Sequence, residues 1–324
     1  MDRRERAVNL GLIALVAAAP LVAWALGEVY YINLASRVAI VAMAAVGLNL
    51  ALGFGGMVSF GHAAFFGLGG FVAGVAAFHD FEETLFAGLL PGTNQMLVIW
   101  PVAMVICGVV AAAIGAISLR TQGVYFIMIT LAFAQMIFYF AVSFPAYGGE
   151  YGLSIYVRNE LPLVDTSDPM QFFAISFLGL VAAIWISARI MASRFGAALT
   201  MARLNETRLA TSGIEPFPVR LTAFVLSAMI TGLAGALFAD LNNFVGPSML
   251  SWQRSGEIMV IVILGGVGRL YGPVAGAILF ILLETFIGAE TEHWQLFLGL
   301  ILLGIVLFAR GGVLGALAGG ARHG

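Results

Sequence analysis

The sequence contains no lysine and a single cysteine, and it is poor in charge of either sign. All 15 basic residues are arginine, so this chain cannot build a P-loop lysine, a Schiff-base lysine or a Ser–Lys dyad. Cys107 lies inside an apolar run and has no partner for an internal disulfide, so we expect it to serve packing. Charged residues make up 10% of the chain, against about a quarter in soluble domains. These shortages exclude an ordinary soluble globular protein.

Apolar residues dominate what remains. They account for 61% of the 324 residues, the mean hydropathy is +1.01, and the chain has 40 glycines. Small side chains let membrane helices pack closely, because in lipid the close approach of backbones replaces hydrophobic collapse. The apolar runs are continuous rather than alternating, which favours helices. We therefore expect an all-α integral membrane protein that forms one transmembrane domain over residues 1–324.

About ten segments are candidates to cross the roughly 30 Å of bilayer hydrocarbon. The third is crowded with glycine between Gly53 and Gly70, and glycine costs a helix about 1 kcal/mol per residue relative to alanine. We expect a broken or re-entrant helix there. The eighth is too short to span as a straight helix. The ten expected segments are residues 7–26, 32–52, 58–78, 95–118, 124–143, 171–192, 221–242, 257–267, 274–288 and 296–308.

The positions of the arginines predict how the chain is oriented. Cytoplasmic loops retain positive charge, and an even number of spans puts both termini on one side. We predict an N-in, C-in topology with an outer loop at 144–170 and a charged inner loop at 193–220. The first apolar run lacks a clear cleavage site, so we expect a retained helix. The arginines expected inside are Arg3, Arg4, Arg6, Arg120, Arg189, Arg194, Arg203, Arg208, Arg220, Arg269, Arg310 and Arg322, and those expected toward the outside are Arg37, Arg158 and Arg254.

Two glycine-rich stretches suggest an internal duplication. Residues 55–63 and 265–273 each follow an expected outside-to-inside span and begin the next one, so both turns face the cytoplasm. This is the pattern of a possible parallel internal repeat. Chance similarity between glycine-rich membrane segments is the alternative.

A series of short motifs recurs in a fixed order between residues 38 and 284. The motifs are GLNL at 47–50, GFGG at 53–56, SFGHAAFFG at 59–67, GVYF at 123–126, TLAFAQ at 130–135, GGEYGL at 148–153, SRFG at 193–196, AFVLSA at 223–228, GLAGA at 232–236 and LGGVG at 264–268. Each motif alone is weak, but the ordered set resembles the branched-chain amino acid permease family of ABC importers, and specifically its LivM-type subunit. Two positions depart from the family pattern, Met57 where glutamine is more frequent and Tyr151 where aspartate is common.

The resemblance implies a permease subunit rather than an enzyme. Its partners would be a homologous permease subunit, two cytoplasmic ATPases and a periplasmic substrate-binding protein, in a bacterial inner membrane and without nucleic acid. The chain has no G-x-x-x-x-G-K-[ST] motif, so ATP would be bound by the partner ATPases and no cofactor by this chain. Branched-chain amino acids, other amino acids, amides and urea all remain open as substrates.

The inner loop at 193–220 is suited to receive the motion of an ATPase. Ser193 is expected to cap a short helix over residues 196–212, Gly213 to end it in the left-handed conformation, and Pro216 and Pro218 to prevent its continuation. A solvated connecting loop is the alternative. The candidate ATPase-coupling residues are Ser193, Arg194, Arg203, Asn205, Glu206, Arg208 and Gly213.

Four polar side chains within apolar segments are candidates for the translocation path: Asn49, Ser59, His62 and Gln135. Amide and hydroxyl groups solvate a passing zwitterion without trapping it, and ionisable groups at membrane depth tend to line pathways. Interhelical hydrogen bonds are the commoner use of such groups and remain the alternative. We expect no catalytic or metal-binding residues.

Two other functional classes remain to be weighed. An ion-gradient-driven secondary transporter of small polar solutes also uses broken helices and buried polar groups, and Glu284 within an apolar run would serve it as a proton carrier. If Glu284 is not protonated, we expect it to pair with an arginine from another helix. An intramembrane enzyme would use Ser59 and His62 as nucleophile and base, but no third orienting group is apparent. Asp240, Asn242 and Asn243 are expected to mark the outer end of the seventh span, at a wetted rim. The alternative is that, with Arg254 and Glu257, they meet a binding protein.

Overall fold

The computed structural model describes residues 3–86, 88, 90–162, 164–290, 293–308 and 311–318. Within these residues the chain is mainly helical, and eight helices are long and apolar enough to cross a membrane. The expected all-α, multi-pass membrane architecture is confirmed. The long helices are α1 (Arg3–Ala25), α2 (Val29–Asn49) continued by the π-helix η1 (Leu50–Phe54), α3 (His62–Phe81), α4 (Met96–Ser118), α5 (Val124–Val142), α6 (Pro169–Met191), α9 (Pro216–Asn242) and α11 (Gly272–Glu290).

The shorter elements explain why the described part has fewer full spans than expected. A helix lies in each of the ten expected segments, but α10 (Trp252–Gly265) has 14 residues and α12 (Trp294–Phe308) has 15. At about 1.5 Å per residue, neither reaches 30 Å. The remaining elements are α7 (Arg194–Leu204), α8 (Glu206–Thr211), α13 (Gly312–Ala318), the 3₁₀ helices η2 (Pro145–Tyr147) and η3 (Pro247–Leu250), and the strands β1 (Leu85–Phe86), β2 (Leu90–Pro91), β3 (Leu153–Ser154) and β4 (Phe244–Val245).

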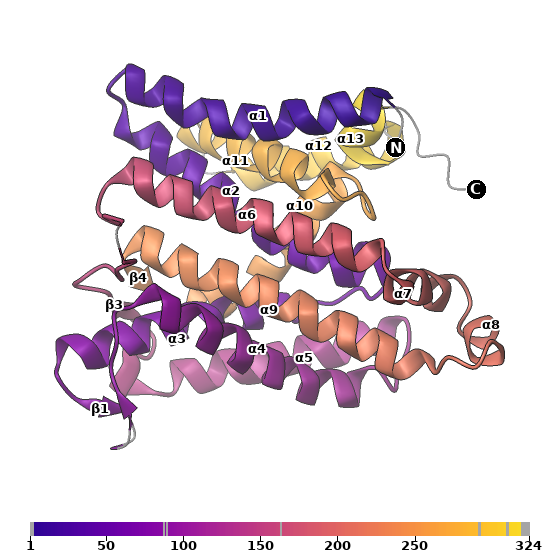
Figure 1. The fold of residues 1–324 in the computed structure, drawn as a ribbon, viewed down its shortest axis with the longest axis horizontal. Coiled ribbons are helices and arrows are strands. Elements are labelled where there is room, and N and C mark those ends of the chain that lie inside the picture. The colour runs from indigo at the N-terminus through magenta and orange to yellow at the C-terminus, as the bar shows by residue number, and fades with distance from the viewer. Residues whose placement is uncertain are drawn as a thin grey trace.

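The core of the molecule is built around α2. Every residue of α2 from Val38 to Asn49 is buried, and α1, α6, α9, α10 and α11 pack around it (Figure 1). Glycine permits the closest approach, between α3 and α9. A Cβ added at Gly235 would lie 1.7 Å from the carbonyl oxygen of Phe66. As expected for membrane helices, small residues rather than large side chains set these distances.

The third expected span is broken, as its glycines predicted. The helix begins at His62 instead of residue 58, and residues 55–61 before it are not helical. The first turn of α3 meets the first turn of α10 inside the protein, where the Ala63 amide donates to Ser255 Oγ at 2.8 Å and Ser255 Oγ donates to the Phe60 carbonyl at 2.6 Å. From this point the two helices run in opposite directions.

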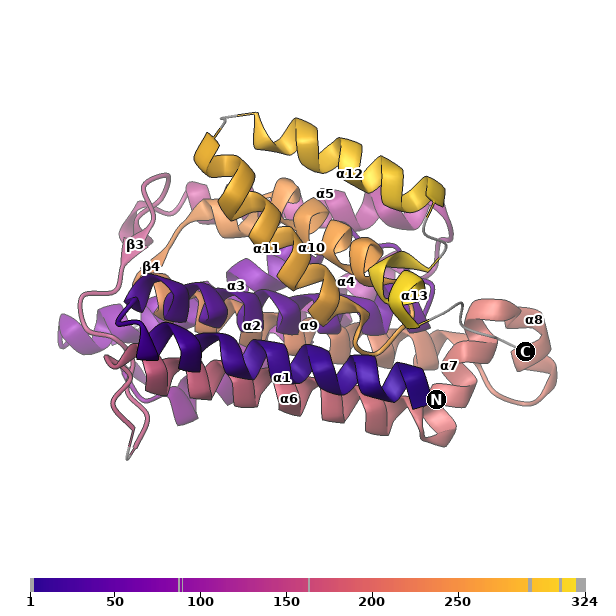
Figure 2. The same ribbon diagram turned by 90° about the horizontal axis from the view of Figure 1, so that it is seen from above.

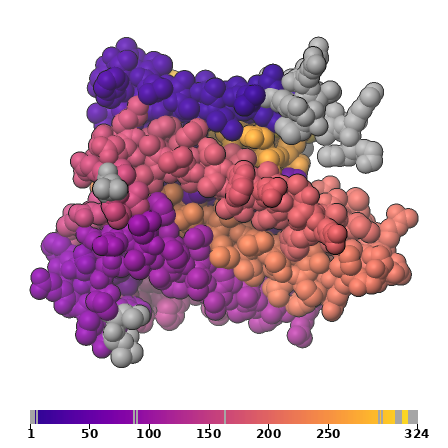
Figure 3. All heavy atoms as spheres, viewed as in Figure 1, coloured from indigo at the N-terminus to yellow at the C-terminus, as the bar shows by residue number. Residues whose placement is uncertain are grey.

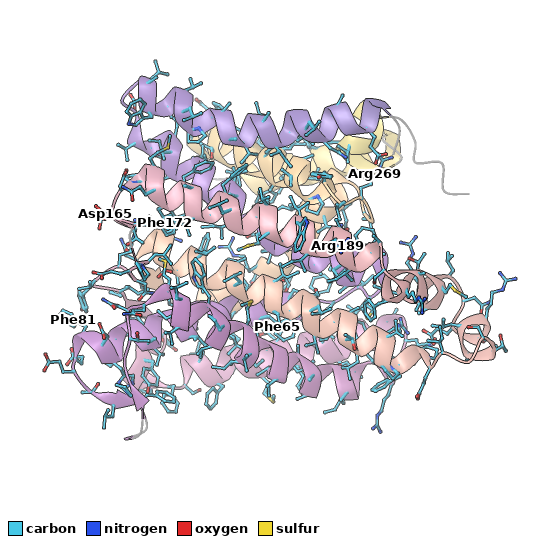
Figure 4. All side chains as sticks on the ribbon, viewed as in Figure 1. Phe65, Phe81, Asp165, Phe172, Arg189 and Arg269 are labelled. Atoms are coloured by element: carbon cyan, nitrogen blue, oxygen red, sulfur yellow. The ribbon has the colours of Figure 1, made fainter. Side chains whose placement is uncertain are left out.

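The two ends of the molecule carry different elements. One end, which we call the inner end, holds α7, α8, the start of α1 and α13, and the opposite, outer end holds the strands (Figures 1 and 2). Figure 4 places Asp165 and Phe81 at the outer end and Arg269 at the inner end. This charge distribution agrees with the predicted orientation, although Arg37 and Arg254 lie within α2 and α10 and not in outer loops. Arg310 and Arg322 lie outside the described residues.

The second glycine-rich turn lies at the inner end against the end of α2 and η1, directly before the first turn. The Gly268 amide donates to Asn49 Oδ1 at 3.0 Å, and a Cβ added at Gly53 would lie 2.5 Å from the Gly268 nitrogen. Their common location fits the expectation that both turns face the same side. The parallel repeat itself stays a prediction.

The outer loop at 144–170 is attached to the outer end of α9. Strand β3 pairs with β4 in antiparallel register, and Arg158 donates to the carbonyls of Thr166 and Leu241. The expectation of a wetted Asp240 is wrong, because its carboxylate is fully buried and accepts from Asn159 Nδ2 at 2.6 Å. The loop folds over this part of α9 and removes the Asp240 carboxylate from solvent.

Candidate coupling region and translocation path

The inner loop forms two short helices, so the expectation of one helix over residues 196–212 is wrong. Helix α7 ends at Leu204 and α8 begins at Glu206. Asn205 between them has an extended backbone, with φ −163° and ψ 104°, and its side chain accepts from the Arg208 amide at 2.9 Å. An asparagine side chain that satisfies the first amides of a new helix competes with continuation of the old one, which accounts for the break.

The expected stops of this region are present. Ser193 Oγ accepts from the Gly196 amide, so it caps α7 as predicted. Gly213 adopts φ +85° after α8, in the left-handed conformation that glycine reaches without steric cost. Pro216 then occupies the first position of α9. The segment from α7 to the start of α9 projects from the inner end of the molecule (Figure 3).

Arg203 connects α7 to the end of α2. Its Nη1 donates to the carbonyl of Gly53 in η1, and its aliphatic stem lies over Gly56. Gly56 has φ +68°, and a Cβ there would approach Arg203 Cγ to 2.7 Å, so only glycine fits under this side chain. Arg203 Nη1 also lies 3.5 Å from where a Cβ of Gly268 would stand. One side chain of the inner loop therefore contacts both glycine-rich turns.

Glu206 fixes α8 to two other elements. Its carboxylate pairs with Arg220 of α9 and accepts from Gln122 Nε2, in the turn between α4 and α5, at 2.7 Å. Beside these contacts lies a polar cavity of about 380 Å³. The cavity is lined by Gly55, Gly56, Gln122, Ala202, Arg203, Leu204, Asn205, Glu206, Thr207 and Arg220.

The two sides of α7 differ. Leu199 is fully buried in the same apolar cluster as Met57 and Phe65, so α7 is seated on the segment that leads into α3. On the outward side, Leu204 is 73% exposed, and Ser193, Arg194, Arg208 and Gly213 are exposed as well. These predicted residues form a mixed apolar and cationic surface at the inner end.

Asn49 and Ser59, two of the predicted path residues, are buried and hydrogen-bonded. Asn49 Nδ2 donates to the Arg269 carbonyl at 2.9 Å, and its Oδ1 accepts from Gly268. Ser59 Oγ accepts from the Gly61 amide at 3.1 Å. Asn49 joins the end of α2 to the turn after α10, which is the interhelical use weighed for it above, whereas the described bond of Ser59 lies within its own turn.

His62 occupies the buried start of α3. Its Nε2 lies 2.7 Å from Ser227 Oγ, near the middle of the 27-residue α9, and Ser227 Oγ donates to the Gly47 carbonyl at 2.6 Å. The imidazole makes edge contacts with Phe65 and Phe224, and no described group pairs with its Nδ1. The described partner of His62 Nε2 is Ser227 and that of Ser59 Oγ is the Gly61 amide, so no described contact joins Ser59 and His62 as the nucleophile–base pair that an intramembrane enzyme needs.

Gln135 lies apart from the other three path candidates. It belongs to α5, whose side chains are mostly exposed or half-buried, and it is itself half-buried. Its Nε2 has no partner among the described residues. The four candidates therefore do not converge on one site within this chain.

Four charged residues inside the membrane segments form a group that the motifs did not indicate. Arg37 of α2 pairs with Glu284 of α11, with Nη2 2.7 and 2.9 Å from the two carboxylate oxygens. Arg254 and Glu257 of α10 pair at 2.7 Å. Pairing of Glu284 with an arginine from another helix was one of the two expected outcomes and is confirmed. Part of the signal was available in the sequence, since Arg37 and Glu284 interrupt apolar runs.

The sequence profile of the family described as branched-chain amino acid transport system, permease component, matches residues 30–307. The chain belongs to that family. The high-affinity branched-chain amino acid transport system permease protein LivM of Escherichia coli (strain K12) is 25% identical over 311 residues, covering 87% of this chain and 69% of the relative. LivM of Salmonella typhimurium matches with the same identity and coverage. No solved structure matches the chain at a significant level.

Membership in the family confirms that the chain is a multi-pass permease subunit of an ABC importer, which works with other subunits. The ion-gradient-driven carrier is not favoured. Within this permease, the inner loop and the glycine-rich turns are in contact, so one region contains both the predicted coupling residues and the breaks in the transmembrane helices.

Proposed function

We propose that this permease moves a branched-chain amino acid across the bacterial inner membrane, with a homologous permease subunit completing the path. Two cytoplasmic ATPases bind and hydrolyse the ATP, and a periplasmic binding protein delivers the substrate. Both relatives belong to high-affinity branched-chain amino acid transport systems, which supports this substrate class. This chain binds no cofactor in the proposal and catalyses no reaction of its own.

The observation that carries the coupling role is the contact of Arg203 with Gly53. In the proposal, the ATPases dock on the exposed surface of α7 and α8, which carries Leu204, Arg194 and Arg208. When they close on ATP, α7 moves with them. Because Leu199 is packed beside Met57 and Arg203 holds the Gly53 carbonyl, that displacement reaches the end of α2 and the segment before α3.

Glu206 has a different task in this mechanism. Its bonds to Arg220 and Gln122 join α8 to α9 and to the α4–α5 turn. The two short helices, separated at Asn205, therefore contact different parts of the transmembrane domain. An ATPase that displaces them together would move both parts at once.

Replacing Arg203 and Glu206 together by alanine tests the coupling role. In the assembled importer in proteoliposomes, we expect uptake of labelled leucine to fall about tenfold, a loss of about 1.4 kcal/mol in coupling, while ATP hydrolysis and membrane insertion persist. Arg120→Ala, which removes an exposed inner-end arginine outside α7 and α8, is the matched control. An unchanged ratio of transport to hydrolysis in the double variant would contradict the proposal.

A further inference from the structure

The charged group at membrane depth has features of a binding site. Arg37, Glu284, Arg254 and Glu257 come from three helices, α2, α11 and α10, and form two ion pairs with no net charge. Arg254 is held from a second side, because its guanidinium lies 5.4 Å from the centre of the Phe238 ring. The positions of these charges are thus fixed by contacts to several helices.

These side chains are not sealed inside the subunit. The exposed fractions are 30% for Arg37, 23% for Glu284, 22% for Arg254 and 30% for Glu257. Charged groups within membrane segments are costly in lipid, and they nearly always face the protein interior or a water-filled cavity. The face formed by α2, α10 and α11 around them therefore faces water or other protein in the membrane.

A small cavity lies among the charges. It is lined by all four of them and by apolar side chains that include Val41, Phe66, Ile258, Ile261 and Ile281. In this state its volume is about 10 Å³, which accommodates at most one water molecule. A cation, an anion and branched apolar side chains around one cavity match the three parts of a branched-chain amino acid: carboxylate, ammonium and aliphatic side chain.

We propose that this cavity, which we call the charged station, binds the zwitterionic amino acid during its passage. The inference rests on the proposed function and names where that substrate is held. The carboxylate of the substrate pairs with Arg37 and its ammonium with Glu284, while Arg254 and Glu257 keep their own pair. The aliphatic side chain lies among Val41, Ile258 and Ile281.

The exchange of partners keeps the charges balanced. Opening the Arg37–Glu284 pair alone would leave two uncompensated charges at membrane depth, which is strongly unfavourable. A zwitterion supplies one opposite charge to each of them, so each ion loses one partner and gains another. When the substrate leaves, the original pair re-forms, and the cavity closes to the volume seen here.

The station is connected to the inner loop through α10. The close packing of α10 on α11 lies toward the inner end, where a Cβ at Gly276 would stand 1.9 Å from the Ile261 carbonyl. The turn after α10 contains Gly266 at φ +118° and Gly268 at φ +75°, and Arg203 reaches Gly268. A displacement of α7 therefore acts on the helix that carries Arg254 and Glu257.

Thiol protection tests the station with its charges intact. Native Cys107 is fully buried, so a thiol introduced by Ile281→Cys would be the reactive one. In the assembled importer during ATP hydrolysis, a small cationic methanethiosulfonate should label it. Leucine at about ten times its dissociation constant should slow the labelling about tenfold, because the occupied fraction is protected. At the same concentration, 3-methylbutylamine and 4-methylpentanoate, which each lack one charge, should protect little.

Ile40→Cys is the matched control, since this residue is adjacent to Val41 on α2 but fully buried outside the cavity lining. It should remain unlabelled. An Ile281→Cys thiol that is never labelled, or is labelled equally with and without leucine, overturns the station. A wild-type importer that takes up no leucine instead contradicts the proposed function, so the two failures are distinguishable.

A paired substitution separates substrate binding from structural support. Arg37→Met with Glu284→Leu removes both charges and leaves neither unpaired, and such replacements commonly preserve stability. We expect the complex to assemble and hydrolyse ATP while leucine uptake falls about tenfold. Ser36→Ala, which removes a hydroxyl bonded within α2 to the Ile32 carbonyl, should transport normally. If the paired variant takes up leucine at the wild-type rate, the ion pair has only a structural role. If the variant fails to assemble, the labelling of the Ile281→Cys thiol decides whether the substrate binds here.

Discussion

Helices α3 and α10 begin at the same buried place and share Ser255, yet their first turns are built differently. The start of α3 is closed by neutral groups: His62 is fully buried between Phe65 and Phe224 and bonded to Ser227. The start of α10 carries Arg254 and Glu257, both partly exposed. Both helices begin inside the protein, but the side chains at the start of α3 are buried, whereas the charged side chains at the start of α10 are partly exposed.

The difference separates a structural use of a broken helix from a functional one. A helix that ends inside a membrane protein must satisfy its free amides within the protein. At α3, Ser59 and Ser255 accept from the free amides of Gly61 and Ala63, and the residues that start the helix carry no ion pair. At α10 charges are present beyond that need, and their cost in lipid requires another explanation. The following three predictions test this contrast.

The largest effect is expected where α3 is seated on α9. Gly235→Ala would place a Cβ 1.7 Å from the Phe66 carbonyl oxygen, and neither backbone is free to move. Overpacking of this kind costs about 3 kcal/mol or more, so we expect loss of monodisperse protein in gel filtration and a clearly lowered Tm. Gly256→Ala on α10, with no described atom within 4 Å of the added Cβ, should change the Tm little. Equal stability of the two variants would show that α3 is not packed this tightly.

A smaller effect is expected at His62. His62→Ala leaves a cavity between two phenylalanines and removes the bond to Ser227, at a cost of about 2–4 kcal/mol. His62→Phe keeps an aromatic ring and should recover most of the thermal stability, since Ser227 still donates to Gly47. Leucine uptake per folded complex should be normal in the phenylalanine variant. If the His62→Phe variant is fully stable but does not take up leucine, His62 belongs to the translocation path after all.

The smallest effect is expected at the shared serine. Ser255→Ala leaves the Ala63 amide and the Phe60 carbonyl buried without their partner, which costs about 1–3 kcal/mol. Thermal unfolding in detergent measures it. Ser251→Ala removes a half-buried hydroxyl that caps no amide of α10 and serves as the control. If both serines prove equally dispensable, the two helix starts are not joined in the way described.

Much of this fold follows from local properties of the sequence. The lengths of the apolar runs located the helices, and the glycines between Gly53 and Gly70 predicted the break before α3. Ser193 and Gly213 marked the limits of the inner loop because capping depends on adjacent residues. Each of these features is decided within a few residues of chain.

The features that were missed depend on contacts between distant segments or on competing local signals. Arg37 and Glu284 are 247 positions apart, and nothing in either neighbourhood specifies the partner. Asp240 was expected at a wetted rim because its burial depends on a tertiary contact, the folding of the outer loop over α9, which the sequence around Asp240 does not reveal. At Asn205 the continuation of α7 competed with capping of α8, and composition alone favoured the longer helix.

Helix α9 connects the inner end and the outer end of the subunit without interruption. Its 27 residues correspond to about 40 Å, more than the thickness of the bilayer hydrocarbon. The outer loop is fastened to one tip through β3, β4 and Arg158, and α8 is fastened near the other through Arg220. A force that a docked protein applies to the outer loop would therefore be transmitted to the inner surface through one uninterrupted helix.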